Sequence, residues 1–160
     1  MLDWLANSEF ALWVNQSWGW PIALTIHAFG TATVVGLAFI IGLRVIGFFQ
    51  TIPYTSLNRL VPLIWVAVIF QAISGFTLWM TKPASYLADG MFEIKFSLVI
   101  VAVIVFWYFH GILRRETPEW EASGSVSSRG FKFAVAACLL WAAVTIGGRL
   151  TAYLGQLYAT

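Results

Sequence analysis

The sequence predicts an all-α fold, an integral membrane four-helix bundle preceded by a short N-terminal amphipathic helix at the membrane surface. Three observations lead to this fold class. Of the 160 residues, 60% are apolar and only 10% are charged, a composition far from that of soluble domains. The apolar residues form four runs, each long enough to cross a hydrocarbon core of about 30 Å. Short polar segments separate these runs, so residues 1–160 are expected to form a single membrane domain.

Residues 2–14 predict the surface helix. Their apolar side chains recur at helical spacing, while Asp3, Asn7 and Glu9 lie mostly on other faces. A short helix with this pattern lies in the membrane interface. The two acids also stand where a cleavable signal peptide carries basic residues, so the first long apolar run is expected to stay in the mature protein.

The spanning helices follow from the apolar runs and from the turn residues between them. Pro21 stands where the start of a helix tolerates proline. Residues 116–129 are charged and then rich in serine and glycine, so they predict an exposed loop. The four helices are therefore expected at about residues 21–49, 58–81, 92–113 and 130–157.

A stripe of small and polar residues in the second helix predicts a face that packs inside the bundle. Ala67, Gln71, Ser74 and Gly75 recur there at helical spacing. Gln71 lies near the middle of the helix, where it serves either as a hydrogen-bonding residue between helices or as a ligand contact.

The placement of lysine and arginine predicts the orientation. Most of them lie in segments 44–59 and 114–132, around the first and third connections. By the positive-inside rule these connections face the cytoplasm, so both termini are expected to be extracytoplasmic. The basic residues lie at helix ends rather than on one face, which argues against nucleic acid as a partner and leaves the lipid bilayer.

The two histidines are the first candidate site residues. His27 lies early in its helix and His110 late in a helix that runs the same way, roughly twelve residues deeper, or about 18 Å at ~1.5 Å per residue. The two axial nitrogens of one haem are only about 4 Å apart, at bonds of about 2 Å each. A single haem held between these two histidines is therefore not expected.

Sorting the polar residues by depth predicts an outer layer around His27. Arg149 comes to about the same level, Lys95 lies a turn nearer the surface, and Gly30 leaves room for a flat ring beside the imidazole. Arg149 follows a seam of small residues, and at the centre of a bilayer an arginine costs about 2.5–3.5 kcal/mol, so an anionic or accepting partner is expected. For Lys95 the simpler interpretation is snorkelling to the interface, and for His27 it is a hydrogen bond in the core.

Arg44 and His110 share a level near the cytoplasmic interface and predict a second polar site. Here too a simpler interpretation exists, snorkelling for Arg44 and an aromatic belt for His110, which is flanked by Trp107 and Tyr108. The lone Cys138 lies in an apolar helix and is interpreted as a packing residue rather than a redox or metal-binding residue.

The segment Trp20-Pro21, followed by Ile-His-Ala-Phe-Gly at 26–30, with Lys95 opening a third helix that ends with His110, resembles a family of uncharacterised bacterial four-helix membrane proteins. More remotely, it is similar to the copper-resistance D-like proteins and to the HemJ-type protoporphyrinogen oxidases. The resemblance covers all four helices.

This resemblance implies a bundle that binds b-type haem or porphyrin through helix-borne histidines. His27 would be an axial ligand of the haem iron, and His110 a second ligand or a porphyrin contact. Two-haem cytochromes of this general architecture use two pairs of histidines, whereas this chain has two histidines in all. A second axial ligand for His27 would have to be another side chain, and Met80 and Met91 are the candidates, although both lie near helix ends.

Together these features predict a redox subunit of a membrane complex in the bacterial inner membrane. It would bind haem b, or a quinone, and transfer electrons between a partner and the quinone pool. His27 would be the axial or hydrogen-bonding ligand, Arg149 and Lys95 would hold anionic groups, and His110 with Arg44 would form a polar site on the cytoplasmic side. Two alternatives stay open, a haem-dependent porphyrinogen oxidase and a cofactor-free structural subunit that braces a larger complex.

Overall fold

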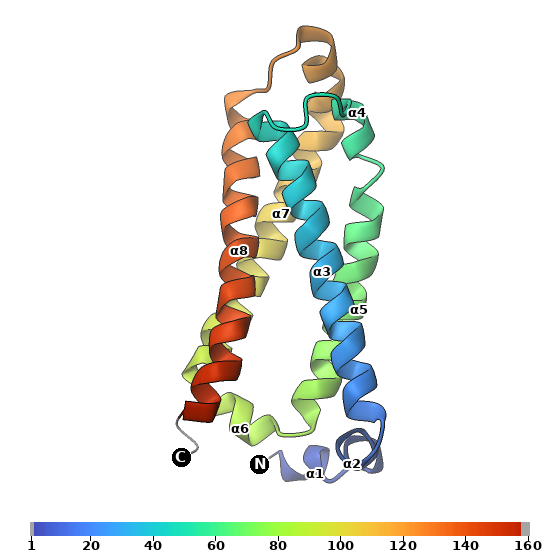
Figure 1. Cartoon of the computed structure of the whole chain (residues 1–160), viewed down its shortest axis with the longest axis vertical. Coiled ribbons are helices and arrows are strands. Elements are labelled where there is room, and N and C mark those ends of the chain that lie inside the picture. The colour runs from blue at the N-terminus through green and yellow to red at the C-terminus, as the bar shows by residue number, and fades with distance from the viewer. Residues whose placement is uncertain (1, 158–160) are drawn as a thin grey trace.

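The computed structural model describes residues 2–157, with side chains described for residues 2–150. Four of its helical segments are long and apolar enough to cross a membrane. Figure 1 shows them as one antiparallel bundle without strands in the described residues, so the predicted all-α membrane fold is confirmed. The long helices are α3 (Gly19–Ile46), α5 (Val61–Met80), α7 (Gly90–Ser123) and α8 (Ser128–Leu157).

The first residues and the end of α8 lie at the same end of the bundle, which we call the termini end (Figure 1). The connections after α3 and after α7 lie at the opposite end, which we call the loop end. Short helices cover both ends: α1 (Asp3–Ala6), α2 (Glu9–Gln16) and α6 (Pro83–Leu87) at the termini end, and α4 (Tyr54–Leu57) at the loop end.

The single surface helix predicted over residues 2–14 is wrong in its extent, because the chain forms α1 and α2 with a break at Ser8. The Ser8 hydroxyl donates to the carbonyl of Leu5 (2.8 Å) and accepts from the amide of Ala11 (3.3 Å), so it caps α2. α2 buries Ala11 and Val14 and leaves aromatic side chains exposed, as an interfacial segment does: Phe10, Trp13 and, beside the helix, Trp4 and Trp18.

The bounds of the spanning helices differ from the predicted ones by at most three residues, except at the end of the third. α3 starts slightly early and stops at Gly47, whose φ of +121° ends the helix in a conformation that suits glycine. α5 starts late because residues 54–57 form the separate helix α4. α8 matches the predicted helix closely, although the side chains beyond residue 150 lie outside the described set.

The exposed loop predicted over residues 116–129 is wrong in most of its extent, because α7 continues to Ser123 and only residues 124–127 connect it to α8. Thr117 holds this extension against the connection before α5. Its hydroxyl donates to the carbonyl of Leu113 (2.8 Å) and accepts from the side-chain amide of Asn58 (2.8 Å). Tertiary contacts therefore override the loop-like composition of this segment.

Trp120 is the second anchor of the α7 extension. It is buried, and its ring packs edge-on against Tyr54 of α4, with the centroids 5.9 Å apart. Pro118 removes one backbone donor within the helix, but it lies on the exposed side. The packing of Thr117 and Trp120 keeps the segment helical despite that loss.

The tightly packed core occupies the half of the bundle toward the loop end. In Figure 1 the α3–α5 pair and the α7–α8 pair are close together there and spread apart toward the termini end. Eleven described hydrophobic side chains of the spanning helices are at most 1% exposed. All of them lie in the half toward the loop end or around the middle of the bundle: Val34, Ala38, Ile41, Val61, Ile64, Ala102, Phe106, Phe109, Leu113, Ala134 and Ala137. Polar residues in the other half are therefore not part of this apolar core.

Candidate functional site

His27 lies where α3 packs on α5, and side chains of α5 contact both of its ring nitrogens. Nδ1 is 3.1 Å from the Ser74 hydroxyl, and Nε2 is 3.1 Å from the side-chain nitrogen of Gln71. The Ser74 hydroxyl donates its own hydrogen to the carbonyl of Phe70 (2.7 Å). It therefore accepts from Nδ1–H, while Nε2 accepts from the Gln71 amide, an arrangement that suits a neutral imidazole.

Thr31 completes this network. The second amide hydrogen of Gln71 is donated to the Thr31 hydroxyl (2.6 Å), which donates in turn to the carbonyl of His27 (2.9 Å). Gln71 Oε1 is buried and has no hydrogen-bond partner within the described residues. We call His27, Thr31, Gln71 and Ser74 the His27 cluster, and its one unused buried group is an acceptor.

Two glycines allow the helices to approach at this cluster. A Cβ built on Gly30 would lie 2.6 Å from Gln71 Oε1, and one built on Gly75 would lie 3.1 Å from His27 Cε1. The predicted role of Gly30, to leave room for a flat ring beside the imidazole, is therefore corrected. The Gln71 carboxamide fills that room, and the glycine that faces the imidazole is Gly75.

Lys95 of α7 brings a positive charge to the same layer. Its ammonium is near enough to His27 for an electrostatic interaction, and its stem passes Gly148 of α8, where a built Cβ would lie 3.5 Å from Cε. The side chain is half-buried, and no carboxylate within the described residues pairs with it. The structure therefore places Lys95 within electrostatic range of His27, consistent with predicted depths that differ by one helical turn.

Arg149 does not join them. Its side chain is exposed, and it is the preceding residue, Gly148, that faces Lys95. Successive residues of a helix are rotated by about 100°, and residues four apart drift by about 40° around it. The seam of small residues predicted to lead to Arg149 consists of Ala134, Cys138, Ala142 and Thr145. It accordingly faces the bundle at Cys138 and has turned outward at Thr145.

Arg44 and His110 have different partners, so the predicted joint site near the loop end is not formed. His110 Nδ1 accepts from the indole nitrogen of Trp65 (3.3 Å). Arg44 is 6% exposed, so it does not snorkel, and its guanidinium lies 3.7 Å above the ring centroid of Tyr54. Its Nε donates to the carbonyl of Ile52, which ties the connection after α3 back onto that helix.

Replacing Arg44 with methionine is expected to lower the free energy of unfolding by about 1–3 kcal/mol, because a cation–π contact and a charge-assisted hydrogen bond are lost. Denaturation of the protein in mixed micelles by sodium dodecyl sulfate, followed by circular dichroism, measures the change. Arg59→Met is the matched control, since Arg59 is exposed at the same end. Equal losses in the two variants would contradict a structural role for Arg44.

The two histidines contact α5 at different depths. Trp65, the partner of His110, precedes Gln71 and Ser74 by six and nine residues, or about 9–14 Å along the helix. This separation has the predicted direction and is smaller than the depth difference of about 18 Å predicted from the sequence. A single haem does not fit between the two imidazoles.

Nor does the arrangement around His27 suit haem ligation. An axial histidine needs a free ring nitrogen, and Ser74 and Gln71 contact both. Met80 follows Ser74 by six residues, about 9 Å along α5, which is too far for the opposite axial position. Across the described part of the chain, no group of three or more His, Cys, Asp or Glu side chains gathers to hold a metal ion.

Thr31 is the member of the His27 cluster to which the sequence pattern did not point. It follows His27 by four residues and therefore lies on the same helical face, and that spacing is the signal that leads to it. Gln71 takes the first of its two predicted roles, the hydrogen bond between helices.

Comparison of the chain with protein-family models, with curated proteins and with solved structures finds no match. The resemblance to haem-binding and porphyrin-binding four-helix proteins therefore stays a prediction. Inferences about function depend on the geometry around His27 and Lys95.

Proposed function

We propose that this protein is a redox subunit of a complex in the bacterial inner membrane and that it binds a lipid-soluble quinone in the layer of His27 and Lys95. A partner protein exchanges electrons with this bound quinone, which in turn exchanges with the quinone pool. One observation carries the proposal: the Lys95 ammonium is half-buried beside the His27 cluster, without a carboxylate partner among the described residues.

The chemistry of a quinone suits this environment. A cation inside a membrane is costly unless an acceptor contacts it. A quinone carbonyl is such an acceptor, and it gains negative charge as the quinone takes up two electrons and, with two protons, becomes a quinol. A fixed ammonium stabilises that developing charge. The neutral His27 adds polarity without a second positive charge, and the apolar helices surround the ring.

We also propose that the loop end faces the cytoplasm. Exposed cations gather at that end, and the positive-inside rule then gives extracytoplasmic termini. The exposed cations are Arg59, Arg114, Arg115, Arg129 and Lys132.

Binding of a quinone without an isoprenoid chain tests the function. The purified protein in lipid nanodiscs is titrated, and quenching of tryptophan fluorescence is followed. We expect saturable binding that Lys95→Met weakens tenfold or more, because methionine keeps the contact with Gly148 and removes the charge. Lys82→Met, at an exposed lysine in the connection after α5, is expected to bind as the wild type does.

Two outcomes would overturn the proposal. Absence of saturable binding would favour the cofactor-free structural subunit. A haem spectrum of the purified protein that disappears in His27→Ala would favour haem ligation, and with it the porphyrinogen oxidase becomes testable by its activity.

A further inference from the structure

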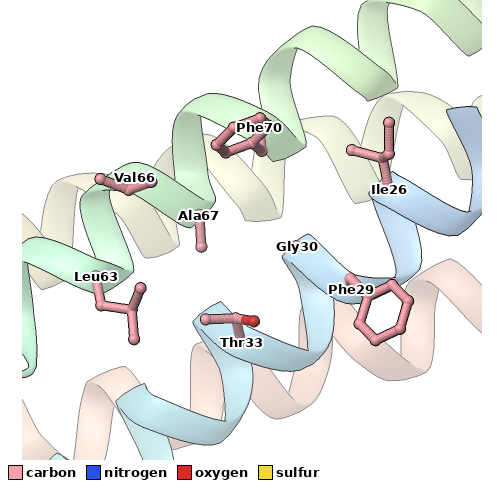
Figure 2. A pocket seen from close by; sticks show the side chains of 8 residues that line it. All are labelled: Ile26, Phe29, Gly30, Thr33, Leu63, Val66, Ala67 and Phe70. Carbon is pink, nitrogen blue, oxygen red and sulfur yellow. The ribbon is translucent and has the colours of Figure 1, made fainter.

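A groove of about 320 Å³ runs between α3 and α5 on the outside of the bundle (Figure 2). Each helix contributes four lining residues at spacings of three and four, so one face of each helix forms a wall. Gly30 and Ala67 are buried at the bottom of the groove, and the larger apolar side chains around them are exposed. The lining residues are Ile26, Phe29, Gly30, Thr33, Leu63, Val66, Ala67 and Phe70.

Thr33 gives this apolar groove a polar group. Its hydroxyl, drawn in Figure 2, makes no hydrogen bond within the described part of the chain. Other threonines of the spanning helices donate to the carbonyl four residues earlier: Thr25, Thr31, Thr77, Thr117 and Thr145. An unpaired hydroxyl facing lipid is unfavourable, so a ligand with a carbonyl or hydroxyl group would be stabilised here.

A second polar group lies directly behind the bottom of the groove. Gln71 Oε1, the unused acceptor of the His27 cluster, would be 2.6 Å from a Cβ on Gly30. Gln71 does not itself line the groove, so Gly30 lies between the groove and this buried oxygen. A buried acceptor without a partner is rare in proteins and calls for a donor.

We infer that this groove is a second quinone site, at which the ligand exchanges with the bilayer. The ring lies over Gly30, and the Thr33 hydroxyl hydrogen-bonds to one ring oxygen. Gln71 Oε1 is buried behind Gly30 and contacts the ligand only when the Gln71 side chain rotates toward the groove. The isoprenoid chain lies against the exposed apolar wall. The inference rests on the proposed function, since the ligand is the same, and it adds the route by which that ligand leaves and joins the pool.

The location of the groove agrees with such an exchange site. Gly30 and Thr33 lie around the middle of α3, and Ala67 and Phe70 around the middle of α5, so the groove opens near the bilayer midplane. His27 precedes Gly30 by three residues, about one turn of α3, so the two proposed quinone sites are neighbours along this helix.

Photolabelling of the full chain in nanodiscs tests the inference. The probe is an azido-quinone with an isoprenoid chain, and labelled peptides are identified by mass spectrometry. We expect labels on the groove segments of α3 and α5, reduced at least fivefold by Val66→Trp, which fills the groove. Ile69→Trp is the matched control, because Ile69 is 58% exposed on the same helix and does not line the groove.

The role of the Thr33 hydroxyl in binding the ligand is tested separately. Thr33→Val keeps the shape of the side chain and is expected to reduce groove labelling about threefold to tenfold, whereas Thr77→Val, at a hydroxyl already bonded to the carbonyl of Ile73, leaves it unchanged. Equal groove labelling by a phospholipid probe of similar chain length, or labelling indifferent to Val66→Trp, would overturn the inference. These results can occur while Lys95-dependent quinone binding persists, so the two proposals fail separately.

Discussion

Replacing Trp120 with alanine is expected to lower the free energy of unfolding by about 3–5 kcal/mol, the usual cost of removing a buried aromatic side chain. Trp120 is 2% exposed and lies between Tyr54 of α4 and Gly130 of α8, where a built Cβ would approach its Cη2 to 2.6 Å. Truncation therefore leaves a cavity where three helices meet. The 34 residues of α7 span about 51 Å, well beyond a hydrocarbon core of about 30 Å, so this end of the helix is expected to reach water, where the hydrophobic effect adds to the cost.

Denaturation by sodium dodecyl sulfate in mixed micelles, followed by circular dichroism, measures this change. Trp107→Ala is the control, since Trp107 is on the same helix but 60% exposed, and its loss is expected to cost less than about 1 kcal/mol. If both variants lost the same stability, the packing of the α7 extension against α4 and α8 would be refuted.

Gly30→Leu is the second substitution with a large expected effect, about 2–4 kcal/mol. A Cβ at this position already meets Gln71 Oε1 at 2.6 Å and the carbonyl of Ala67 at 3.5 Å, so a leucine must push α3 and α5 apart. Overpacking of this kind typically costs about 1–3 kcal/mol. Displacement of Gln71 also removes its hydrogen bonds to His27 and Thr31, each worth roughly 0.5–1.5 kcal/mol.

Gly36→Leu is the matched control, because nothing lies within 4 Å of a Cβ built there and the residue is exposed on the same helix. Denaturation gives the stability of both variants, and the ¹⁵N chemical shifts of the His27 imidazole report on its hydrogen bonds. We expect the wild type and Gly36→Leu to share the spectrum of a neutral Nδ1–H ring, and Gly30→Leu to depart from it. An unchanged imidazole spectrum in Gly30→Leu would mean that Gln71 does not hold His27.

The failed loop prediction at residues 116–129 has a definite physical cause. Charge and Ser/Gly content are local properties, and they describe the exposed face of that segment correctly. The helix is instead held by Thr117 and Trp120, whose partners are more than fifty residues away in the sequence, at Asn58 and Tyr54. Two buried positions in a charged segment are too few to produce a readable helical period.

The candidate site was predicted in part. The depths of His27 and Lys95 follow from counting residues along helices of known direction, and the structure brings the two together. Arg149 has a suitable depth as well, but its side chain is exposed, because depth says nothing about which way a side chain leaves the helix. The pairing of Arg44 with Tyr54 likewise depends on the path of a connecting segment.

The sequence by itself determined the class of the protein, an antiparallel membrane bundle of four helices. Apolar runs and turn residues can be recognised locally, and the thickness of the bilayer sets how long an apolar run must be to cross it. For α5 the stripe of Ala67, Gln71, Ser74 and Gly75 already indicated the inner face, but only the tertiary structure decided how the other helices are rotated about their axes. Lipid is as apolar as a packed core, so no hydrophobic period marks the inner face of those helices. Their rotation comes from close contacts at Gly30 and Gly75 and from hydrogen bonds between α3 and α5, and that rotation turns His27 toward Gln71 and Ser74.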